Sequence, residues 1–252
     1  MKPQILILGG TTEARLLPPE IPDVLTSKYD IVTSFSGITK SPKIETGQIR
    51  IGGFGGIKGL SNYITANNVS AIIDATHPFA KAMPKHAYEA SKINQCKLVR
   101  YLRPEWFEET DDLWIYADSL DQAATLIPQL GKHAFLALGS RDLAAFKDVS
   151  GLKLTARMIE KAAKENLPKD CQIIYARPPF HLNEEETLFS ELKIDILVTK
   201  NSGAQATKAK IEACRNLGIK VLMINRPAPQ PVPIITSQDQ MIHWLKEELR
   251  HD

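Results

Sequence analysis

Four apolar residues run directly into a pair of glycines in the segment Ile5-Leu6-Ile7-Leu8-Gly9-Gly10-Thr11-Thr12-Glu13-Ala14-Arg15. Such a run is typical of a parallel strand that is covered on both faces, and the glycines allow a tight turn. Thr11 or Thr12 can cap a following helix, whose unpaired N–H groups and positive dipole end would face an anion. The third glycine of the dinucleotide fingerprint is missing, so a purely structural turn is the alternative to a phosphate site.

The composition is that of an ordinary globular protein. Of the 252 residues, 43% are hydrophobic and 24% are charged, and the formal net charge is +2. This near-neutral balance argues against nucleic acid as the main partner. No apolar run approaches the roughly 20 residues that a membrane span requires. We therefore expect a cytoplasmic protein with no nucleic-acid or membrane partner.

Cysteine usage points to no metal centre and no disulfide framework. Cys96, Cys171 and Cys214 lie far apart and none belongs to a CxxC pair. We expect all three to be small buried residues in a reducing compartment.

Short β-rich runs alternate with helical patterns along most of the chain. This alternation predicts an α/β fold of two doubly wound lobes with mainly parallel sheets. The least regular stretch, near 104–112, separates the lobes, which we place at residues 1–104 and 105–252. Prolines at 18, 19 and 22 should shorten the first helix. Besides 5–8, strands are predicted at 29–35, 49–51, 71–74, 96–101, 134–138, 152–158, 172–176, 194–199 and 220–224, and helices at 60–66, 80–94, from 143–146 onward, 183–192 and 206–217.

Unusual residues follow several of the predicted strands. Ligands of doubly wound folds bind beyond the carboxyl ends of the strands, so we expect a site in a cleft between the lobes. Gly52-Gly53-Phe54-Gly55-Gly56 exposes backbone amides to a flat or phosphorylated ligand, or else forms a flexible hairpin tip. Asp74-Ala75-Thr76-His77-Pro78-Phe79-Ala80 brings together an acid, a hydroxyl and an imidazole, although its histidine could be structural.

The second lobe repeats this arrangement. Thr199-Lys200-Asn201-Ser202-Gly203 can hold a carboxylate or phosphate, or it can be a solvated loop. Tyr101-Leu102-Arg103-Pro104-Glu105-Trp106 forms either a linker or a rigid wall for an anionic aromatic ligand. The sequence contains no GxSxG, GxxxxGK[ST] or HExxH motif, which argues against acyl transfer, P-loop phosphoryl transfer and zinc hydrolysis.

Taken in order, these segments resemble the precorrin-6A reductases of cobalamin biosynthesis. The resemblance spans nearly the whole chain and is carried by ILILGGTTEAR, GGFGG, DATHPFA, YLRPEW, GSRDLAAF and VTKNSGAQATKAKIEACRNLGIKVLMINRP. It implies two Rossmann-like lobes, in some members with strands exchanged between the sheets. It also implies an oxidoreductase that uses NADH or NADPH to reduce precorrin-6A, or cobalt-precorrin-6A, to the 6B form. Transient contact with neighbouring enzymes of the pathway is a further expectation.

The chemistry of the residues at these positions suits particular roles in such a reaction. Cofactor contacts are expected from the first turn, the end of the second strand and the DATHPFA segment, namely Gly9, Gly10, Thr11, Thr12, Ser36, Gly37, Thr39, Thr76, His77 and Phe79. The carboxylates of the macrocycle require local cations and amides, for which the candidates are Gly53, Phe54, Gly55, Arg103, Arg141, Arg177, Lys200, Asn201, Ser202 and Gly203. Lys200 or His77 is the expected proton donor, with water or the substrate's own carboxylates as alternatives.

The choice of cofactor depends on one departure from the family pattern. The family usually has an arginine after the glycine that follows the second strand, where it can pair with the 2′-phosphate of NADPH, but Ile38 stands here. Ser36, Thr39, Lys40 and Lys43 could still accept a phosphate. The strand also lacks the terminal acid that would bind a free ribose diol. Because the cobalt-dependent branch of the family is associated with NADH, we expect NADH or NADPH, with the balance toward NADH.

Two other functions stay open. One is a nicotinamide-dependent reductase or epimerase acting on another substrate. The other is a module that binds nucleotide or tetrapyrrole without catalysing a reaction.

Overall fold

The protein is described by a computed structural model that covers residues 2–37, 45–159 and 167–250. The chain divides into two compact units, one made of Met1–Pro104 with Ala228–Asp252 and the other of Glu105–Pro227. In the described residues each unit holds one six-stranded sheet in which every strand pair is parallel. The predicted α/β fold with two parallel-sheet lobes is therefore confirmed.

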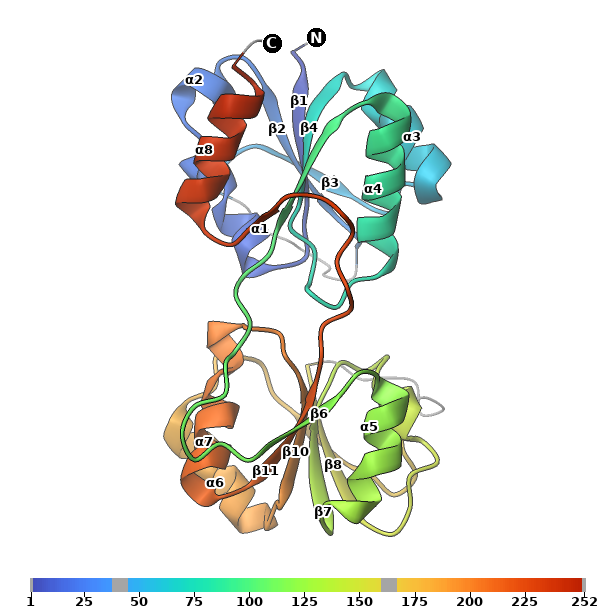
Figure 1. The fold of residues 1–252 in the computed structure, drawn as a ribbon, viewed down its shortest axis with the longest axis vertical. Coiled ribbons are helices and arrows are strands. Elements are labelled where there is room, and N and C mark those ends of the chain that lie inside the picture. Colours follow the sequence, from blue (N-terminus) through green and yellow to red (C-terminus); the bar gives the residue numbers. More distant parts are fainter. Residues whose placement is uncertain (1, 38–44, 160–166, 251–252) are drawn as a thin grey trace. The chain divides into compact units, whose positions relative to one another are not determined.

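The sheet of the first unit has its earliest strand near the centre, in the order β12-β5-β4-β1-β2-β3. Helices cover both of its faces, α3 and α4 on one and α1, α2 and α8 on the other (Figure 1). The bounds are β1 Gln4–Leu8, α1 Thr12–Leu16, α2 Asp23–Thr26, β2 Asp30–Phe35, β3 Gln48–Ile51, α3 Gly56–Ala66, β4 Val69–Asp74, α4 Ala82–Asn94, β5 Lys97–Tyr101, β12 Ile234–Ile235 and α8 Gln238–Glu248.

The second unit has the same strand arrangement, in the order β6-β11-β10-β7-β8-β9. Helix α5 covers one face of this sheet, and α6 and α7 cover the other (Figure 1). The bounds are β6 Trp114–Ala117, α5 Leu120–Leu126, β7 His133–Ala137, β8 Lys153–Met158, β9 Gln172–Tyr175, α6 Leu182–Leu192, β10 Ile196–Lys200, α7 Ala209–Leu217 and β11 Lys220–Ile224.

The edge strands of the two sheets are exchanged. Strand β6 follows β5 along the chain, yet it pairs with β11 in the second sheet. Strand β12 follows β11, yet it pairs with β5 in the first sheet. This chain therefore has exchanged strands, as some members of the family that its sequence resembles do.

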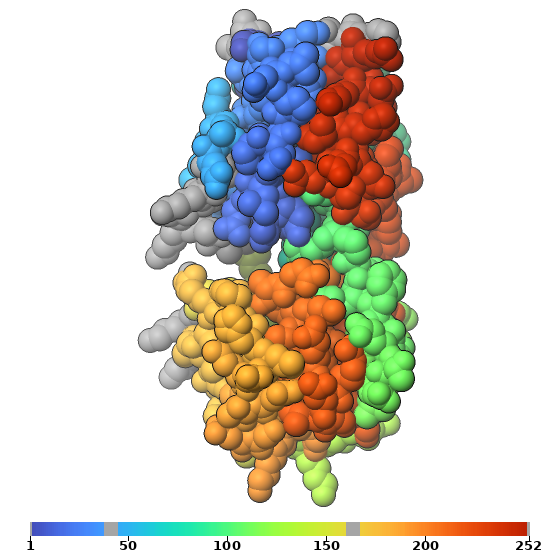
Figure 2. Space-filling model, turned by 90° about the vertical axis from the view of Figure 1, so that its left-hand side faces the viewer, coloured from blue at the N-terminus to red at the C-terminus, as the bar shows by residue number. Residues whose placement is uncertain are grey.

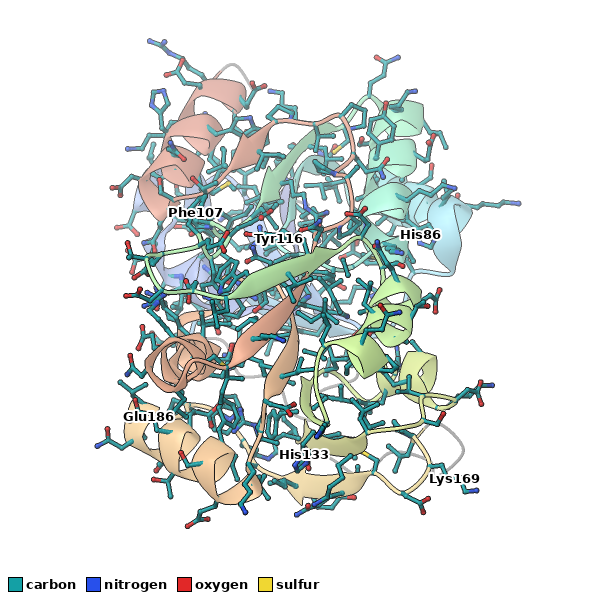
Figure 3. All side chains as sticks on the ribbon, turned by 60° about the horizontal axis from the view of Figure 1, so that its bottom comes forward. His86, Phe107, Tyr116, His133, Lys169 and Glu186 are labelled. Carbon is teal, nitrogen blue, oxygen red and sulfur yellow. The ribbon has the colours of Figure 1, made fainter. Side chains whose placement is uncertain are left out.

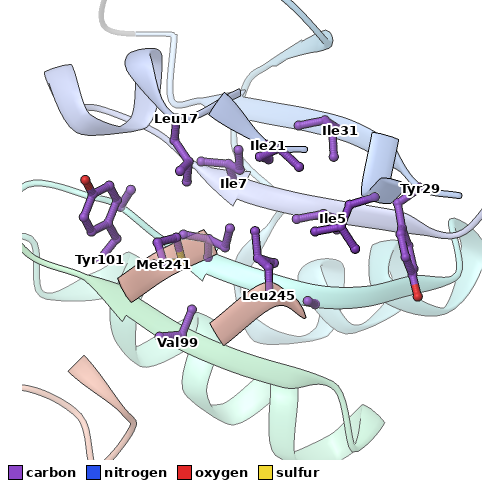
Figure 4. Packing of buried hydrophobic residues seen from close by; sticks show 14 of the residues in the cluster. Ile5, Ile7, Leu17, Ile21, Tyr29, Ile31, Val99, Tyr101, Met241 and Leu245 are labelled. Atoms are coloured by element: carbon purple, nitrogen blue, oxygen red, sulfur yellow. The ribbon is translucent and has the colours of Figure 1, made fainter. Parts of the chain in front are cut away.

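The division of the chain differs from the sequence prediction at one end. We placed all of 105–252 in the second lobe, but residues 228–252 belong to the first unit. Met241 and Leu245 of α8 are fully buried and join Ile5 and Ile7 of β1 in one apolar cluster (Figure 4). Figure 2 shows the C-terminal residues, in red, lying against the N-terminal ones in blue. The returning segment is therefore part of the core of the first unit.

Smaller differences have local causes. The prolines end α1 at Leu16 and leave a short 3-10 helix at Pro18–Glu20, as predicted. Residues Leu143–Phe146 form only a 3-10 helix, not the opening of a longer helix. Four elements were not predicted from the sequence, β6, α5, β12 and α8, although Ser119 and Ser237 each accept a capping hydrogen bond at a helix start. Because these elements lie next to the points where the chain changes units, alternation within one lobe gave no reason to expect them.

A buried ionic network lies within the second unit. Arg157 of β8 donates two hydrogen bonds to Glu185 of α6, one of them 2.8 Å long, and its guanidinium stacks 3.6 Å from the centre of the Phe180 ring. Lys210 of α7 is also buried, and its ammonium lies 5.0 Å from the centre of the Trp106 ring. Burial, with the nearby Arg157 charge as a second cause, lowers the pKa of Lys210 from 10.5 to about 7.

Replacing Lys210 by Met should remove one component of the pH dependence of stability. Between pH 7 and 10.5 the unfolded chain holds a proton on Lys210 that the folded chain has lost, so this group makes the wild type more stable as the pH rises. We therefore expect the free energy of unfolding of Lys210→Met relative to the wild type to fall by up to about 1.4 kcal/mol per pH unit across this window. Urea unfolding of both proteins at several pH values would measure the difference, and parallel curves would contradict the pKa assignment.

Candidate active site

The turns that follow the strands of the first sheet share one edge, because all the strands are parallel. Along this edge the turn after β1 lies between the turn after β4 and the turn after β2. His77 follows β4, whereas the Gly52–Gly56 loop follows β3, two strands away on the other side of β1. The structure therefore brings the predicted residues to one edge but separates His77 and Phe54 to opposite sides of the glycine turn.

The two glycines after β1 do different things. The Gly9 N–H donates to the Ser34 carbonyl at 2.8 Å, and a Cβ on Gly9 would lie only 2.9 Å from the Phe35 ring. Gly9 therefore allows the turn to pack against β2. Gly10 is exposed, has a φ of +134° and faces open space where a Cβ would stand. At Gly10 the backbone is accessible to a ligand, and an extended dinucleotide can approach it closely.

The threonines that follow fix this turn. The Thr11 hydroxyl accepts from Ala14 N–H at 3.2 Å, which caps α1 as predicted, and donates to the Ala75 carbonyl at 2.9 Å. Thr12 is exposed, and its hydroxyl accepts from Arg15 at 3.3 Å. Because α1 has only five residues, its dipole is weak, and N–H groups of the turn itself would provide most of the contact with a phosphate.

Asp74 shapes the turn that carries His77. Its Oδ1 accepts from the N–H and the hydroxyl of Thr76 at 3.1 and 2.7 Å, and its Oδ2 accepts from Arg100 at 2.8 Å. All three side chains are buried. Removing either partner of the Asp74–Arg100 pair would leave a buried charge, at a cost of about 3–5 kcal/mol. The predicted acid and hydroxyl are therefore engaged in holding the turn.

His77 is oriented by its own turn. Its Nδ1 accepts from the Phe79 N–H at 3.2 Å, which assigns the proton of the neutral imidazole to Nε2. The ring is half-buried and lies 6.0 Å from the Phe79 ring, measured between centres. The imidazole is therefore held with Nε2 as its donor atom.

Arg103 lies on the same side of the edge as His77. It follows β5, and its Nη1 lies 2.8 Å from Oε2 of Glu13 in α1, with both side chains largely shielded from solvent. Its charge is thus shared with an acid of the first unit.

Arg50, which the sequence analysis did not single out, organises the glycine-rich loop after β3. Its guanidinium donates to the carbonyls of Gly52 and Gly53 and lies 3.8 Å from the centre of the Phe54 ring. Phe54 also makes an edge-to-face contact with Tyr63 at 5.1 Å. The Phe54 ring is therefore half-buried against these neighbours, while Gly53 and Gly55 are exposed. A charged residue in the last two positions of a strand that runs into paired glycines was the available sequence signal.

The end of β2 is described only in part. Ser36 and Gly37 are exposed there. Ile38, Thr39, Lys40 and Lys43 lie outside the described residues.

Cations gather at the carboxyl edge of the second sheet. Lys200 ends β10, and its ammonium lies 2.7 Å from Oδ2 of Asp142 in the turn after the neighbouring strand β7. Arg141 is exposed in that same turn, and Arg177 is exposed after β9. The structure thus places Lys200 and Arg141 in adjacent turns and Arg177 further along the edge.

Asn201 holds the chain rather than facing solvent. Its Oδ1 accepts from the Trp106 N–H at 2.8 Å, and its Nδ2 donates to the Trp106 carbonyl at 3.0 Å. Arg226 donates to the Asn201 carbonyl at 2.8 Å. Because these bonds occupy both ends of its buried amide, Asn201 fits a structural role better than the predicted contact with substrate.

The next two residues continue this turn. The buried Ser202 donates its N–H to the Lys200 carbonyl at 2.7 Å, and Gly203 is half-exposed with a φ of +68°. Gly203 is therefore the more accessible of the two.

Other candidate chemistry is limited in the residues that the structure describes. They contain no His, Cys, Asp and Glu group suited to a metal ion, and no helix long and apolar enough to cross a membrane. The three cysteines form no disulfide; Cys214 is buried, as expected, but Cys96 and Cys171 are only half-buried. His133, labelled in Figure 3, bonds to Thr155 at the amino end of β7, so it lies at the edge opposite the cations.

Comparisons with known proteins agree with this architecture. The family model described as precorrin-6x reductase CbiJ/CobK matches residues 4–246. The precorrin-6A reductase of Rhodococcus erythropolis is 42% identical over 228 residues, covering 90% of this chain and 91% of the relative. The cobalt-precorrin-6A reductase of Priestia megaterium is 26% identical over 259 residues, covering 98% and 99%.

A solved structure agrees as well. The one named CobK precorrin-6A reductase has a TM-score of 0.87 and 32% identity, and the match covers 98% of this chain and 97% of that one. The resemblance seen in the sequence is confirmed, and the chain belongs to the precorrin-6x reductase CbiJ/CobK family of enzymes.

Proposed function

We propose that the protein reduces the precorrin-6A macrocycle to the 6B form with a nicotinamide dinucleotide, as a step of cobalamin biosynthesis. The observation that carries the proposal is the open backbone at Gly10, at the point where the first sheet reverses its strand order, in a chain whose family is a reductase. This is where doubly wound folds bind dinucleotides.

The residues of the first unit fit such a cofactor. When bound, the nicotinamide supplies a hydride, with both electrons, to a carbon of the macrocycle, while a proton reaches the adjacent atom. The Gly10 turn would hold the pyrophosphate. Because the turn after β4 lies on one side of Gly10, His77 and Phe79 would line the nicotinamide end. Thr76 would act by shaping their turn through Asp74.

The second unit fits the acetate and propionate groups of the substrate. Lys200 is the last residue of β10, and Arg141 and Arg177 follow strands that end at the same edge, so they would meet several carboxylates of one ligand. Asp142 keeps the Lys200 ammonium at that edge until a substrate carboxylate binds. Lys200 or the Nε2–H of His77 would deliver the proton, with water and the substrate's own carboxylates as alternatives.

Several finer assignments belong to this proposal. The relative named for precorrin-6A shares more identity with the chain than the relative named for cobalt-precorrin-6A, which favours the cobalt-free substrate. The cofactor is NADH or NADPH. The absence of a disulfide between the cysteines agrees with a reducing, cytoplasmic location. Transient contact with neighbouring pathway enzymes stays a prediction.

Gly10→Ala should weaken cofactor binding more than it perturbs the fold. The added methyl group occupies the open space that the pyrophosphate would use, and we expect the dissociation constant of NADH and NADPH to rise at least about tenfold. Gly151→Ala is the matched control, since Gly151 also has a positive φ and open space but lies in the loop before β8. Fluorescence titration with NADH and with NADPH measures the dissociation constants of both variants. Equal cofactor affinities of Gly10→Ala and Gly151→Ala would contradict a phosphate site at Gly10.

Lys200→Ala should weaken the substrate interaction and spare the cofactor. Because one cation is lost from the carboxylate-binding edge, we expect KM for precorrin-6A to rise about tenfold, with the cofactor dissociation constant unchanged. Lys132→Ala is the control, because Lys132 is an exposed lysine beside the amino end of β7. Anaerobic turnover assays with metal-free and cobalt-loaded substrate provide the readout.

The same assay separates the alternatives. Loss of cofactor binding in Lys200→Ala would show that the two units are assigned wrongly. Binding of both ligands by the wild type without oxidation of the nicotinamide would favour a non-catalytic module. Turnover of another substrate, with none of precorrin-6A, would favour a different reductase.

A further inference from the structure

Arg50 is held at the ends of two neighbouring strands. It pairs in register with Ser34, the residue before the last of β2, and its Nη1 donates to the Ser34 hydroxyl at 3.2 Å. The guanidinium also donates to the carbonyls of Gly52 at 2.5 Å and Gly53 at 2.9 Å. The guanidinium therefore lies where β2 and β3 both end.

The loop around Arg50 is built before any ligand arrives. The Phe54 ring stacks under the guanidinium, and Tyr63 lies 5.3 Å from it. The Phe54 carbonyl passes so close to Gly59 that a Cβ there would collide with it. These contacts fix both the glycine loop and the direction of the cation.

The charge of Arg50 has no acid beside it in the described part of the chain. By contrast, the arginines at 100, 103, 157, 215 and 226 each lie within 4.0 Å of a carboxylate. The hydrogen bonds that Arg50 donates to described residues go to neutral oxygens and use three of the five guanidinium N–H groups. A half-buried cation among neutral acceptors is suited to binding an anion.

The position of Arg50 identifies the anion. In a doubly wound fold the adenosine ribose lies beyond the end of the second strand, where an acid binds the free 2′-hydroxyl and an arginine accommodates a 2′-phosphate. Here β2 ends in Thr33-Ser34-Phe35, without an acid, and Arg50 is bonded to Ser34. Among the described residues, Arg50 is the cation whose side chain bonds to the end of β2. Lys40 and Lys43 lie outside the described residues.

We propose that Arg50 binds the 2′-phosphate of NADPH and makes this chain select NADPH over NADH. The inference rests on the proposed function and assigns part of its cofactor site. It moves Gly53, Phe54 and Gly55 from the macrocycle to the adenosine end of the cofactor, because their loop follows β3 on the side of β1 away from His77. It also explains how the chain can bind a 2′-phosphate with Ile38 in place of the family's arginine.

Cofactor fragments test this inference without the macrocycle. Calorimetric titration of the full chain with 2′,5′-ADP and with 5′-AMP should show that the wild type binds the first at least about tenfold more tightly. Arg50→Met should lose most of that preference while its affinity for 5′-AMP stays within about threefold. Arg50→Lys, which keeps the charge but not the fork, should fall between them. Lys92→Met, an exposed cation of α4 in the same unit, is the matched control and should behave as the wild type does.

Other results would overturn the inference. Equal loss of both fragments in Arg50→Met, with a native circular dichroism spectrum, would mean that Arg50 only shapes the loop. Equal affinity of the wild type for both fragments would mean that no 2′-phosphate site exists. If Arg50→Met does not fold, the wild type and Arg50→Lys still test the inference. An ionic contact between the Arg50 guanidinium and the 2′-phosphate predicts a preference for 2′,5′-ADP that weakens with added salt and is reduced in Arg50→Lys. A preference that is insensitive to salt and unchanged in Arg50→Lys would overturn the inference. Failure of the wild type to bind NADH or NADPH at all would overturn the proposed function as well, whereas tight binding of NADH without discrimination overturns only the role of Arg50.

Discussion

The parallel sheet of the first unit needs cover on both faces, because its strands are apolar on both sides. Strands β1 and β4 carry isoleucine and leucine side chains that are fully buried on each face. The prolines after α1 leave only short helices on one of these faces, and Met241 and Leu245 of the returning α8 complete the cluster there. The segment that returns to the first unit thus buries apolar surface that the short helices leave uncovered.

That parallel arrangement also gathers the chemistry. With every strand running the same way, the glycine turn, the His77 turn and the Arg50 loop end at one edge of the first sheet, and Lys200 and Arg141 end at one edge of the second. The buried Asp74–Arg100 pair fixes the turn of His77, and Thr11 ties that turn to the glycine turn. Polar side chains that look reactive in the sequence, such as Asp74 and Thr76, are therefore engaged in holding the backbone that a ligand would meet.

Local patterns accounted for most strands and for the class of the fold. Apolar runs bounded by glycines are properties of a few consecutive residues, so β1, β4, β10 and β11 were predicted close to their observed bounds. The elements that were missed, β6 and α8 among them, take their places from the sheet that they join and not from their neighbours in the chain. A two-residue strand such as β12 carries too little pattern to be found. The second lobe was consequently extended to residue 252, beyond the point where the chain returns to the first unit.

For the site, the sequence specified which residue types follow each strand, and through the resemblance it indicated the family. Their partners were decided by folding, because the contacts join residues far apart in the chain. Lys200 pairs with Asp142 across 58 positions, Arg103 with Glu13 across 90, and Asn201 with Trp106 across 95. Arg50 is the clearest case, since an arginine before two glycines has no evident role until β2 and β3 pair and bring Ser34 beside it. Backbone turns can be inferred from local sterics, but the environment of a charge depends on every segment packed around it.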